Sequence, residues 1–270
     1  MSEPAVLYEK KDGIAFVTLN RPDVRNAINT EMLCRLTDAW QDVNDDEAVR
    51  VVILAGAGDK AFCAGADLDR LVRMLQGLRP PETEWDERVR ADLSIIYKGL
   101  LRNYQVFKPI IAAVHGFCVA GGTEILSCTD IRIASDDARF GLAEVKWSLF
   151  PMGGSTVRLP RQIPYCHAME ILLTGEQLSA ERAMQMGLIN KVVSRAALMP
   201  EAMRYAQILC ENGPLAVQAV KRSVLTGLAL PTEQALEQEM EIGIPVSMSE
   251  DCKEGTKAFK EKRKPVFRGR

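Results

Sequence analysis

Two glutamates in the middle of the chain lie next to stretches of small residues. Glu124 follows Ala120-Gly121-Gly122-Thr123, and Glu144 follows Phe140-Gly141-Leu142-Ala143. When two carboxylates share one water, proximity and burial push their pKa values apart, so that one holds a proton while the other accepts one. Such a pair can carry out acid–base chemistry without a metal ion or a covalent nucleophile.

Two segments of small residues could supply the complementary hydrogen-bond donors. Residues 61–68 follow a predicted strand, and residues 120–122 lie where an apolar segment meets a predicted helix start. Small residues let a ligand approach backbone N–H groups closely, and a helix start offers free N–H groups to an anionic oxygen. Two N–H donors from separate loops suit the oxyanion of a thioester, and loss of one such donor typically costs about 3–4 kcal/mol. Glu124 lies three residues after Gly121 and therefore projects from the same helical face.

Each of these features alone also has an ordinary structural explanation. A Gly-Gly pair more often serves packing or capping, Glu124 could belong to a structural salt bridge, and Glu144 could form a solvated ion pair with Lys146. An unpaired buried carboxylate is nevertheless costly, and two glutamates beside two small-residue loops favour a catalytic site. His115, at the end of a predicted strand, is expected to be structural with a local hydrogen-bond partner.

Buried strands that alternate with helices are predicted to position these residues. β-Branched and apolar runs predict strands over residues 14–19, 51–55, 110–114 and 131–134. Apolar residues recur at helical spacing after Asn29, which predicts a helix there. The alternation indicates an α/β fold whose strands are buried on both faces.

The pattern changes near residue 195, where strand signals stop. We predict a core over residues 1–195 that holds the active site and a helical region over residues 196–270, bounded internally by Gly and Pro. The apolar content of this second region suggests that it packs on another subunit. Residues 70–90, which contain Arg79-Pro80-Pro81 and many charges, are expected to form a mobile excursion that shapes the substrate pocket.

Composition excludes several other classes of protein. The chain is 47% hydrophobic and 26% charged with a net charge of −2, whereas a dedicated nucleic-acid-binding domain is usually strongly basic. No apolar run approaches the length of a membrane span, and the first residues do not resemble a signal peptide. Seven cysteines without a CxxC pair suggest reduced thiols in a cytoplasmic protein, and two histidines give no basis for a common zinc site.

The candidate residues belong to a longer series of motifs that resembles the enoyl-CoA hydratase/isomerase (crotonase) family. These motifs occur in the family's order and spacing over nearly the whole chain. They are Leu19-Asn20-Arg21-Pro22, Asn26-Ala27, Ala61 to Leu68, Ile111 to Gly116, Ala120 to Glu124, Cys128 to Ile131, Phe140 to Glu144, Pro151 to Gly154, Leu173 to Gly175, Ala183 to Ile189 and Glu254 to Arg263.

The resemblance implies a crotonase spiral of ββα turns with a C-terminal helical region that builds trimers, often paired into hexamers. Ala66 and Gly121 would supply the two N–H groups of an oxyanion hole, and Glu124 and Glu144 fall where hydratases carry their catalytic pair. Coenzyme A is part of the substrate, and no separate cofactor is implied. The residues expected to bind it are Arg25, Ala27, Ala64, Asp67 and Leu68, together with Phe259 and Lys262 from a tail that in many relatives belongs to a neighbouring subunit.

The activity implied is that of a hydro-lyase of fatty acid metabolism, which adds water to a 2-trans-enoyl-CoA and gives a 3-hydroxyacyl-CoA. In this scheme Glu144 delivers a proton to the α-carbon, while Glu124 mainly positions and activates the water. Ala120 departs from the family pattern by replacing the first residue of a common triple glycine, and His115 stands where Asn is frequent. Trp147 and Phe150 contribute to an individual acyl-pocket wall, so the acyl group is left open.

Two alternatives remain beside hydration. Isomerases of this scaffold typically need a single carboxylate, but dehydratases of specialised acyl-CoAs could retain both glutamates. A non-catalytic RNA-binding protein is the second alternative, because residues 253–270 contain eight basic and two acidic residues that could attract phosphate. A solvated tail, or one that contacts the phosphates of coenzyme A, is the simpler explanation of that charge.

Overall fold

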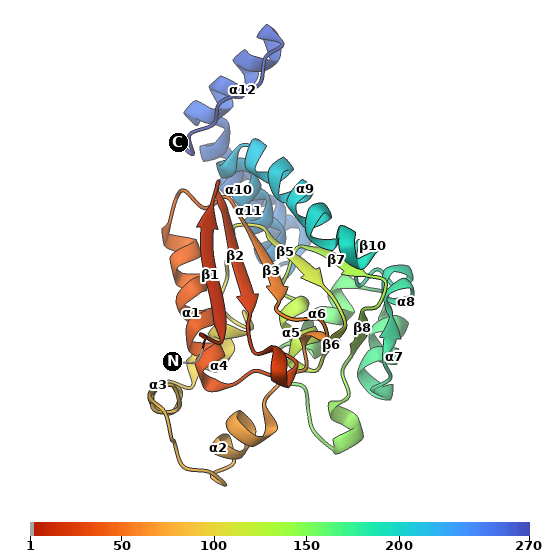
Figure 1. The fold of residues 1–270 in the computed structure, drawn as a ribbon. Helices are drawn as coiled ribbons and strands as arrows, with labels where there is room; N and C mark the ends of the chain where they lie inside the picture. Colours follow the sequence, from red (N-terminus) through yellow and green to blue (C-terminus); the bar gives the residue numbers. More distant parts are fainter. Residues whose placement is uncertain (1–2) are drawn as a thin grey trace.

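A six-stranded and a four-stranded β-sheet form the centre of the molecule (Figure 1). The computed structural model describes residues 3–270. The strands are β1 (Val6–Lys11), β2 (Ile14–Leu19), β3 (Val51–Gly56), β4 (Ala61–Cys63), β5 (Ile110–Val114), β6 (Phe117–Val119), β7 (Ile131–Ser135), β8 (Arg139–Gly141), β9 (Leu178–Ser179) and β10 (Lys191–Val193). The order is β1-β2-β3-β5-β7-β10 in the six-stranded sheet and β4-β6-β8-β9 in the four-stranded sheet.

Helices connect the strands and continue the chain beyond β10. The α-helices are α1 (Thr30–Asp45), α2 (Arg73–Leu75), α3 (Glu84–Ala91), α4 (Ser94–Gly99), α5 (Gly121–Leu126), α6 (Ser155–Gln162), α7 (Tyr165–Thr174), α8 (Ala180–Gln185), α9 (Leu198–Glu211), α10 (Pro214–Gly227), α11 (Thr232–Ser247) and α12 (Glu250–Glu261). Three 3₁₀ helices are η1 (Pro22–Val24), η3 (Glu144–Trp147) and η4 (Arg195–Ala197), and η2 (Leu68–Val72) is a π-helix.

Successive strands from β3 to β8 alternate between the two sheets. β3, β5 and β7 pair in parallel in the larger sheet, while β4, β6 and β8 pair in parallel in the smaller one. Each turn therefore contributes one strand to each sheet before a helical segment returns the chain. This topology confirms the predicted α/β spiral of ββα turns, and the four strands and the first helix expected from the sequence are all present.

Apolar side chains fill the space on both sides of the larger sheet. On one side, the main core includes Trp40 of α1 and reaches the helices that follow the smaller sheet. On the other side, Ile53 and its neighbours on the strands contact Leu198, Ala202 and Ala206 of α9, which recur every four residues on one helical face. Helix α9 thus packs on the sheet although it follows the division predicted at residue 195. That division remains a prediction.

The last helices lie beyond the sheets, and α12 projects from the body of the molecule (Figure 1). Helices α10 and α11 lie against each other, and α12 continues outward. The chain end then folds back along α12, where the Asp251 carboxylate accepts hydrogen bonds from the N–H groups of Arg268 (2.7 Å) and Gly269 (2.8 Å). No strand follows β10 within residues 3–270, as the sequence predicted. None of the helices within residues 3–270 is long and apolar enough to cross a membrane.

Residues 68–92 leave the spiral between β4 and β5 and carry the short helices η2, α2 and α3. The side chains of Arg79 and Asp86 form an ion pair of 2.8 Å, and both are largely buried. Asp86 also accepts a hydrogen bond of 2.6 Å from the Thr30 hydroxyl at the start of α1. A buried ion pair thus ties the segment that was expected to be mobile to the core.

Candidate active site

The two small-residue loops meet where the sequence placed the oxyanion donors. Gly65 has φ +91°, and a Cβ atom there would lie 2.6 Å from the Cβ of Ala120. The amide nitrogen of Ala66 lies 3.8 Å from the point that a Cβ on Gly121 would occupy. Among residues 3–270, neither the Ala66 nor the Gly121 N–H donates to a backbone carbonyl. The structure therefore brings two free donors together, as an oxyanion hole requires.

The backbone is strained just before one of these donors. Ala120 has φ +50° and ψ −125°, a region that residues other than glycine rarely adopt. Its N–H donates to the carbonyl of Gly141 at 2.9 Å, and α5 begins with the next residue. The departure from glycine at position 120 therefore leaves the turn geometry in place at a cost in backbone strain.

The Glu124 side chain extends from α5 and is buried against residues 153–155. The residue is only 5% exposed. The Oε1 atom accepts hydrogen bonds from the Ser155 hydroxyl (2.9 Å) and the Ser155 N–H (3.4 Å). A Cβ on Gly153 would lie 2.5 Å from the other carboxylate oxygen, so only glycine leaves room for it. Burial raises the pKa of Glu124, and the hydrogen bonds from residues 153–155 oppose that rise.

Glu144 opens η3 directly after β8 and has a different environment. Its Oε2 atom is buried and has no hydrogen-bond partner within residues 3–270. Burial raises the pKa of Glu144 to about 7, and the nearby charge of Glu124 adds to the rise. Lys146 pairs with Glu176 at 2.7 Å, so the solvated Glu144–Lys146 pair considered above does not form. The two glutamates thus form an unequal pair: Glu124 accepts hydrogen bonds from residues 153–155, whereas the Oε2 atom of Glu144 has no partner in the described chain.

Five of the residues expected to bind coenzyme A gather around one turn of the backbone. The N–H of Ala64 donates to the carbonyl of Arg25 at 3.0 Å, and Ile28 bridges in parallel to Ala66. The Asp67 carboxylate pairs with Arg21 at 2.8 Å and accepts from the N–H of Arg70, so it is already held by protein partners. Its neighbours remain available at the surface: Arg25 and Leu68 are exposed, while Ala27 and Ala64 are partly exposed.

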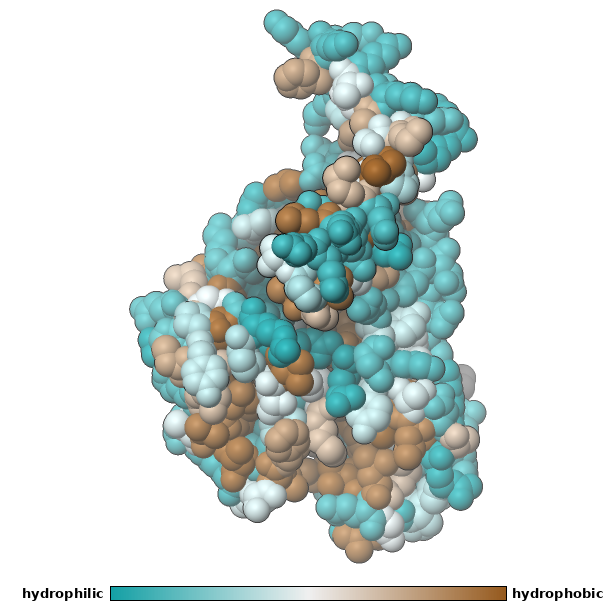
Figure 2. All heavy atoms as spheres, turned by 180° about the vertical axis from the view of Figure 1, so that it is seen from behind, coloured by the Kyte–Doolittle hydropathy of each residue, from teal (hydrophilic) through white to brown (hydrophobic). Residues whose placement is uncertain are grey.

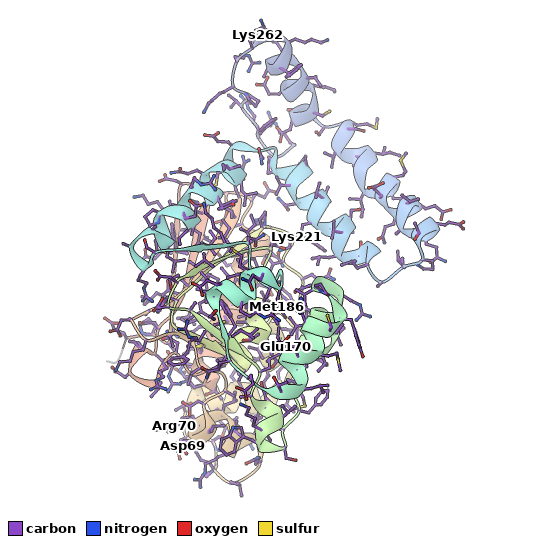
Figure 3. All side chains as sticks on the ribbon, turned by 90° about the vertical axis from the view of Figure 1, so that its right-hand side faces the viewer. Asp69, Arg70, Glu170, Met186, Lys221 and Lys262 are labelled. Atoms are coloured by element: carbon purple, nitrogen blue, oxygen red, sulfur yellow. The ribbon has the colours of Figure 1, made fainter. Side chains whose placement is uncertain are left out.

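The two tail residues expected at the same site lie elsewhere in the chain. Phe259 and Lys262 stand at the far end of α12, and Figure 3 places Lys262 at the opposite end of the molecule from Asp69 and Arg70. Phe259 is 85% exposed. Within one chain the structure does not bring these residues to Arg25 and Leu68.

His115 and Ser155 show where reasoning from the sequence was incomplete. The Nε2 atom of His115 is buried without a hydrogen-bond partner in the described chain, so the expected local partner is not found at this nitrogen, and the structural role remains a prediction. Burial, with a contribution from Arg195, lowers the pKa of His115 to about 4, which keeps the ring neutral. Ser155 was not singled out at all. The available signal was a hydroxyl residue that follows Gly-Gly at a helix start.

Comparisons with known proteins agree with this geometry. The family model described as enoyl-CoA hydratase/isomerase matches residues 9–270. The enoyl-CoA hydratase EchA19 of Mycobacterium tuberculosis is 45% identical over 269 residues, which cover 100% of this chain and 98% of that protein. The (E)-benzylidenesuccinyl-CoA hydratase of Thauera aromatica is 40% identical, over 98% of this chain and 99% of the relative. The crystal structure of an enoyl-CoA hydratase from Bacillus anthracis superimposes with a TM-score of 0.88 at 34% identity, over 98% of this chain and 100% of that one. The chain therefore belongs to the enoyl-CoA hydratase/isomerase family.

Proposed function

We propose that this chain is an enoyl-CoA hydratase, a hydro-lyase that adds water to a 2-trans-enoyl-CoA and gives a 3-hydroxyacyl-CoA. The observation that carries the proposal is the unequal pair of Glu124 and Glu144 close to the two free amides of Ala66 and Gly121. A family member that only moved a double bond would typically need one such carboxylate. The hydratases among its relatives support the same reaction.

The proposed oxyanion hole acts on the carbonyl of the thioester. As water adds to the β-carbon, negative charge develops on the thioester oxygen, and the N–H groups of Ala66 and Gly121 stabilise it. Such donors are fixed before the reaction, so they stabilise the transition state without reorganising. Loss of one donor typically costs about 3–4 kcal/mol in enzymes that use them.

The proposed acid–base steps divide between the two carboxylates. Glu124, whose carboxylate accepts hydrogen bonds from Ser155, positions the water and accepts its proton. Glu144, whose pKa of about 7 leaves it substantially protonated at neutral pH, delivers a proton to the α-carbon. Pairs whose environments separate their pKa values are suited to such a division. Dehydration of a 3-hydroxyacyl-CoA is the reverse of these steps at the same site.

The coenzyme A moiety would lie against the turn that carries Arg25, Ala27, Ala64, Asp67 and Leu68, with Phe259 and Lys262 arriving from a neighbouring chain. A trimer or a dimer of trimers in the cytoplasm belongs to the same proposal. The exposed apolar stripes on α10 and α11 support self-association, and seven free thiols suit a reducing compartment. RNA binding by the basic tail is less favoured, because Arg263 already pairs with Glu254 (2.6 Å) and Glu261 (2.7 Å) of the preceding helix α12.

The test is direct hydration of enoyl-CoA substrates of short, medium and long chain. Loss of the ultraviolet absorbance of the conjugated thioester is followed for the wild type and for Glu124→Gln and Glu144→Gln. Rapid loss in the wild type, suppressed in both variants, is the expected result. No loss with any chain length would refute a simple hydratase and direct the search to isomerisation or to specialised acyl groups.

A further inference from the structure

Helix α6 begins directly against the Glu124 carboxylate. We propose that Ser155, its first residue, is a positioning residue that fixes Glu124 in one orientation and keeps it ionised, so that it can act as the base. This inference rests on the function proposed above and adds a residue to it. Ser155 would not touch the substrate and would act only through Glu124.

The contacts of Ser155 are unusually specific for a serine at a helix start. The residue is fully buried, and its hydroxyl and its N–H donate to the same atom, Oε1 of Glu124, at 2.9 Å and 3.4 Å. A hydroxyl has a single proton to donate, and here it goes to the carboxylate. A serine at such a position more often caps its own helix, whereas this one serves a side chain 31 residues earlier in the chain.

Gly153 completes the restraint from the other side. A Cβ at that position would lie 2.5 Å from Oε2 and 2.6 Å from Cδ of Glu124, so the backbone of the loop is packed against the carboxylate. One carboxylate oxygen is therefore held by donors and the other is confined by the Gly153 backbone. The segment 153–155 thus restrains the Glu124 carboxylate. Within this segment, the Ser155 hydroxyl is the side-chain group that donates to it.

Few other groups could set the charge state of Glu124. Glu144 faces it from η3, and a second negative charge there would favour protonation of Glu124. The Cys128 thiol, at the end of α5, lies 3.5 Å from the backbone oxygen of Glu124 and is neutral because burial raises its pKa. Arg158 of α6 donates instead to the carbonyls of Leu101 (3.1 Å) and Arg102 (2.7 Å). The donors at residues 153–155 are therefore the main opposition to the rise that burial produces in the pKa of Glu124.

The consequence of removing the hydroxyl follows from this geometry. In Ser155→Ala the carboxylate would lose a donor to its charged form, so its pKa would rise and a smaller fraction would be ionised at a given pH. Hydrogen bonds to charged groups are strong enough that we expect kcat to fall roughly 10- to 100-fold. The KM for the thioester should change by less than about twofold, because no substrate contact is removed.

The experiment compares Ser155→Ala with a matched serine. Ser127 is also buried, and its hydroxyl donates to the backbone oxygen of the same glutamate at 2.6 Å, so Ser127→Ala removes an equivalent hydroxyl without touching the carboxylate. The pH dependence of kcat/KM for a short 2-enoyl-CoA is recorded for both variants and for Ser155→Thr, which keeps a hydroxyl. We expect the acid limb to move to higher pH only in Ser155→Ala. A general loss of stability would instead lower the activity of Ser127→Ala and Ser155→Ala alike, and the acid limb of kcat/KM would stay at the wild-type pH.

A second measurement makes the inference independent of turnover. The carboxyl carbon of Glu124 is titrated by NMR in protein with ¹³C-labelled glutamate, and its signal is assigned with Glu124→Gln. The midpoint should rise in Ser155→Ala and stay near the wild-type value in Ser127→Ala. An unchanged midpoint, or a shift that Ser155→Thr does not reverse, would overturn the inference. Absence of hydration by the wild type would overturn the proposed function instead, and the titration would still decide what Ser155 does.

Discussion

Glu124 is buried and Glu144 is partly buried, yet within residues 3–270 only the Glu124 carboxylate accepts hydrogen bonds from other residues. The hydrogen-bond donors at residues 153–155 distinguish the base from the acid, because a buried carboxylate without such donors is more easily kept neutral than charged. The Oε2 atom of Glu144 has no partner within residues 3–270, and its pKa stands near 7. Reaction chemistry and protein stability should both depend on that difference.

The pH dependence of catalysis is the first expectation. Because burial raises the pKa of Glu144 to about 7, the protonated form is present below that pH and is lost above it. In the free enzyme, kcat/KM should therefore decline as the pH rises through about 7. Glu144→Gln should lower the rate about 10²- to 10⁴-fold, the usual contribution of a general acid or base. Stopped-flow hydration of a short enoyl-CoA from acid to alkaline pH checks both points, and a wild-type profile flat through neutrality would contradict the assignment.

The same carboxylate should destabilise the folded protein at alkaline pH. Its pKa is about 7 in the folded state against 4.5 ordinarily, so below about 4.5 it is protonated in both states and costs nothing. Between these values the unfolded chain ionises first, and the penalty grows until the folded pKa is passed. Glu144→Gln removes that penalty and should raise the free energy of unfolding by about 1–2 kcal/mol at pH 8, after allowance for partial solvent access. Thermal melting at pH 8 and pH 5 checks this, and equal gains at both pH values would contradict it.

At the scale of elements, the Arg79–Asp86 ion pair links the excursion between β4 and β5 to the core. Thr30, at the start of α1, donates to the same carboxylate, so α3 is attached to the first core helix. The predicted acyl-pocket role of this segment depends on such an anchor. Removing one partner of a buried pair leaves a buried charge without compensation and typically costs about 3–5 kcal/mol.

Asp86→Ala should therefore release the excursion before it unfolds the core. We expect faster hydrogen exchange over residues 68–92 and earlier cleavage by trypsin after Arg70 or Arg73. Glu87→Ala is the matched control, because it lies on the same helix and breaks only an exposed pair with Arg90. Surface pairs contribute about 0–1 kcal/mol, so the control should behave like the wild type. Equal exchange in the two variants would show that the buried pair is not the anchor.

Local patterns explain which elements were predictable from the sequence. The strands at 51–55 and 110–114 are continuous buried runs, and both glutamates stand beside small residues whose spacing is visible in the chain. The contact of Ser155 with Glu124, the ion pair of Arg79 with Asp86 and the packing of α9 on the sheet join distant segments. Sequence spacing does not encode such contacts, because they depend on how the ββα turns stack. The expectation that two chains share the coenzyme A site rests only on the family resemblance.

At the scale of the whole molecule, the C-terminal helices expose several large apolar side chains, and a contiguous apolar patch often marks an interaction surface. Leu236, Met240 and Ile244 are exposed and recur every four residues along one face of α11, and the exposed Met248 continues this spacing at the end of the helix. Figure 2 shows apolar surface on these helices and more at the opposite end of the molecule. A continuous apolar stripe on a helix that lies beyond the sheets is typical of a surface that another copy covers.

Met240→Glu should weaken that association. Burying an unpaired carboxylate is unfavourable, so we expect the oligomer to dissociate toward monomers at micromolar concentration. Gln234→Glu adds the same charge to an exposed position of the same helix outside the stripe and serves as the control. Sedimentation velocity measures the mass of each variant. A wild-type protein that sediments as a monomer, or a Met240→Glu variant that keeps the wild-type mass, would contradict a role for this face.

The position of the tail leads to a complementation experiment that tests the shared site. Phe259 and Lys262 lie at the far end of α12 from the site of their own chain, so each site should be completed by the tail of a neighbour. A chain carrying Phe259→Ala and Lys262→Ala should bind coenzyme A thioesters weakly, while a chain carrying Glu124→Gln should bind but not turn over. Co-expressed with different affinity tags, the two chains form mixed oligomers in which an intact Glu124 meets an intact tail. Activity at low substrate concentration should then exceed that of either parent oligomer. Mixed oligomers no more active than their parents would mean that the tail serves its own chain or does not contact coenzyme A.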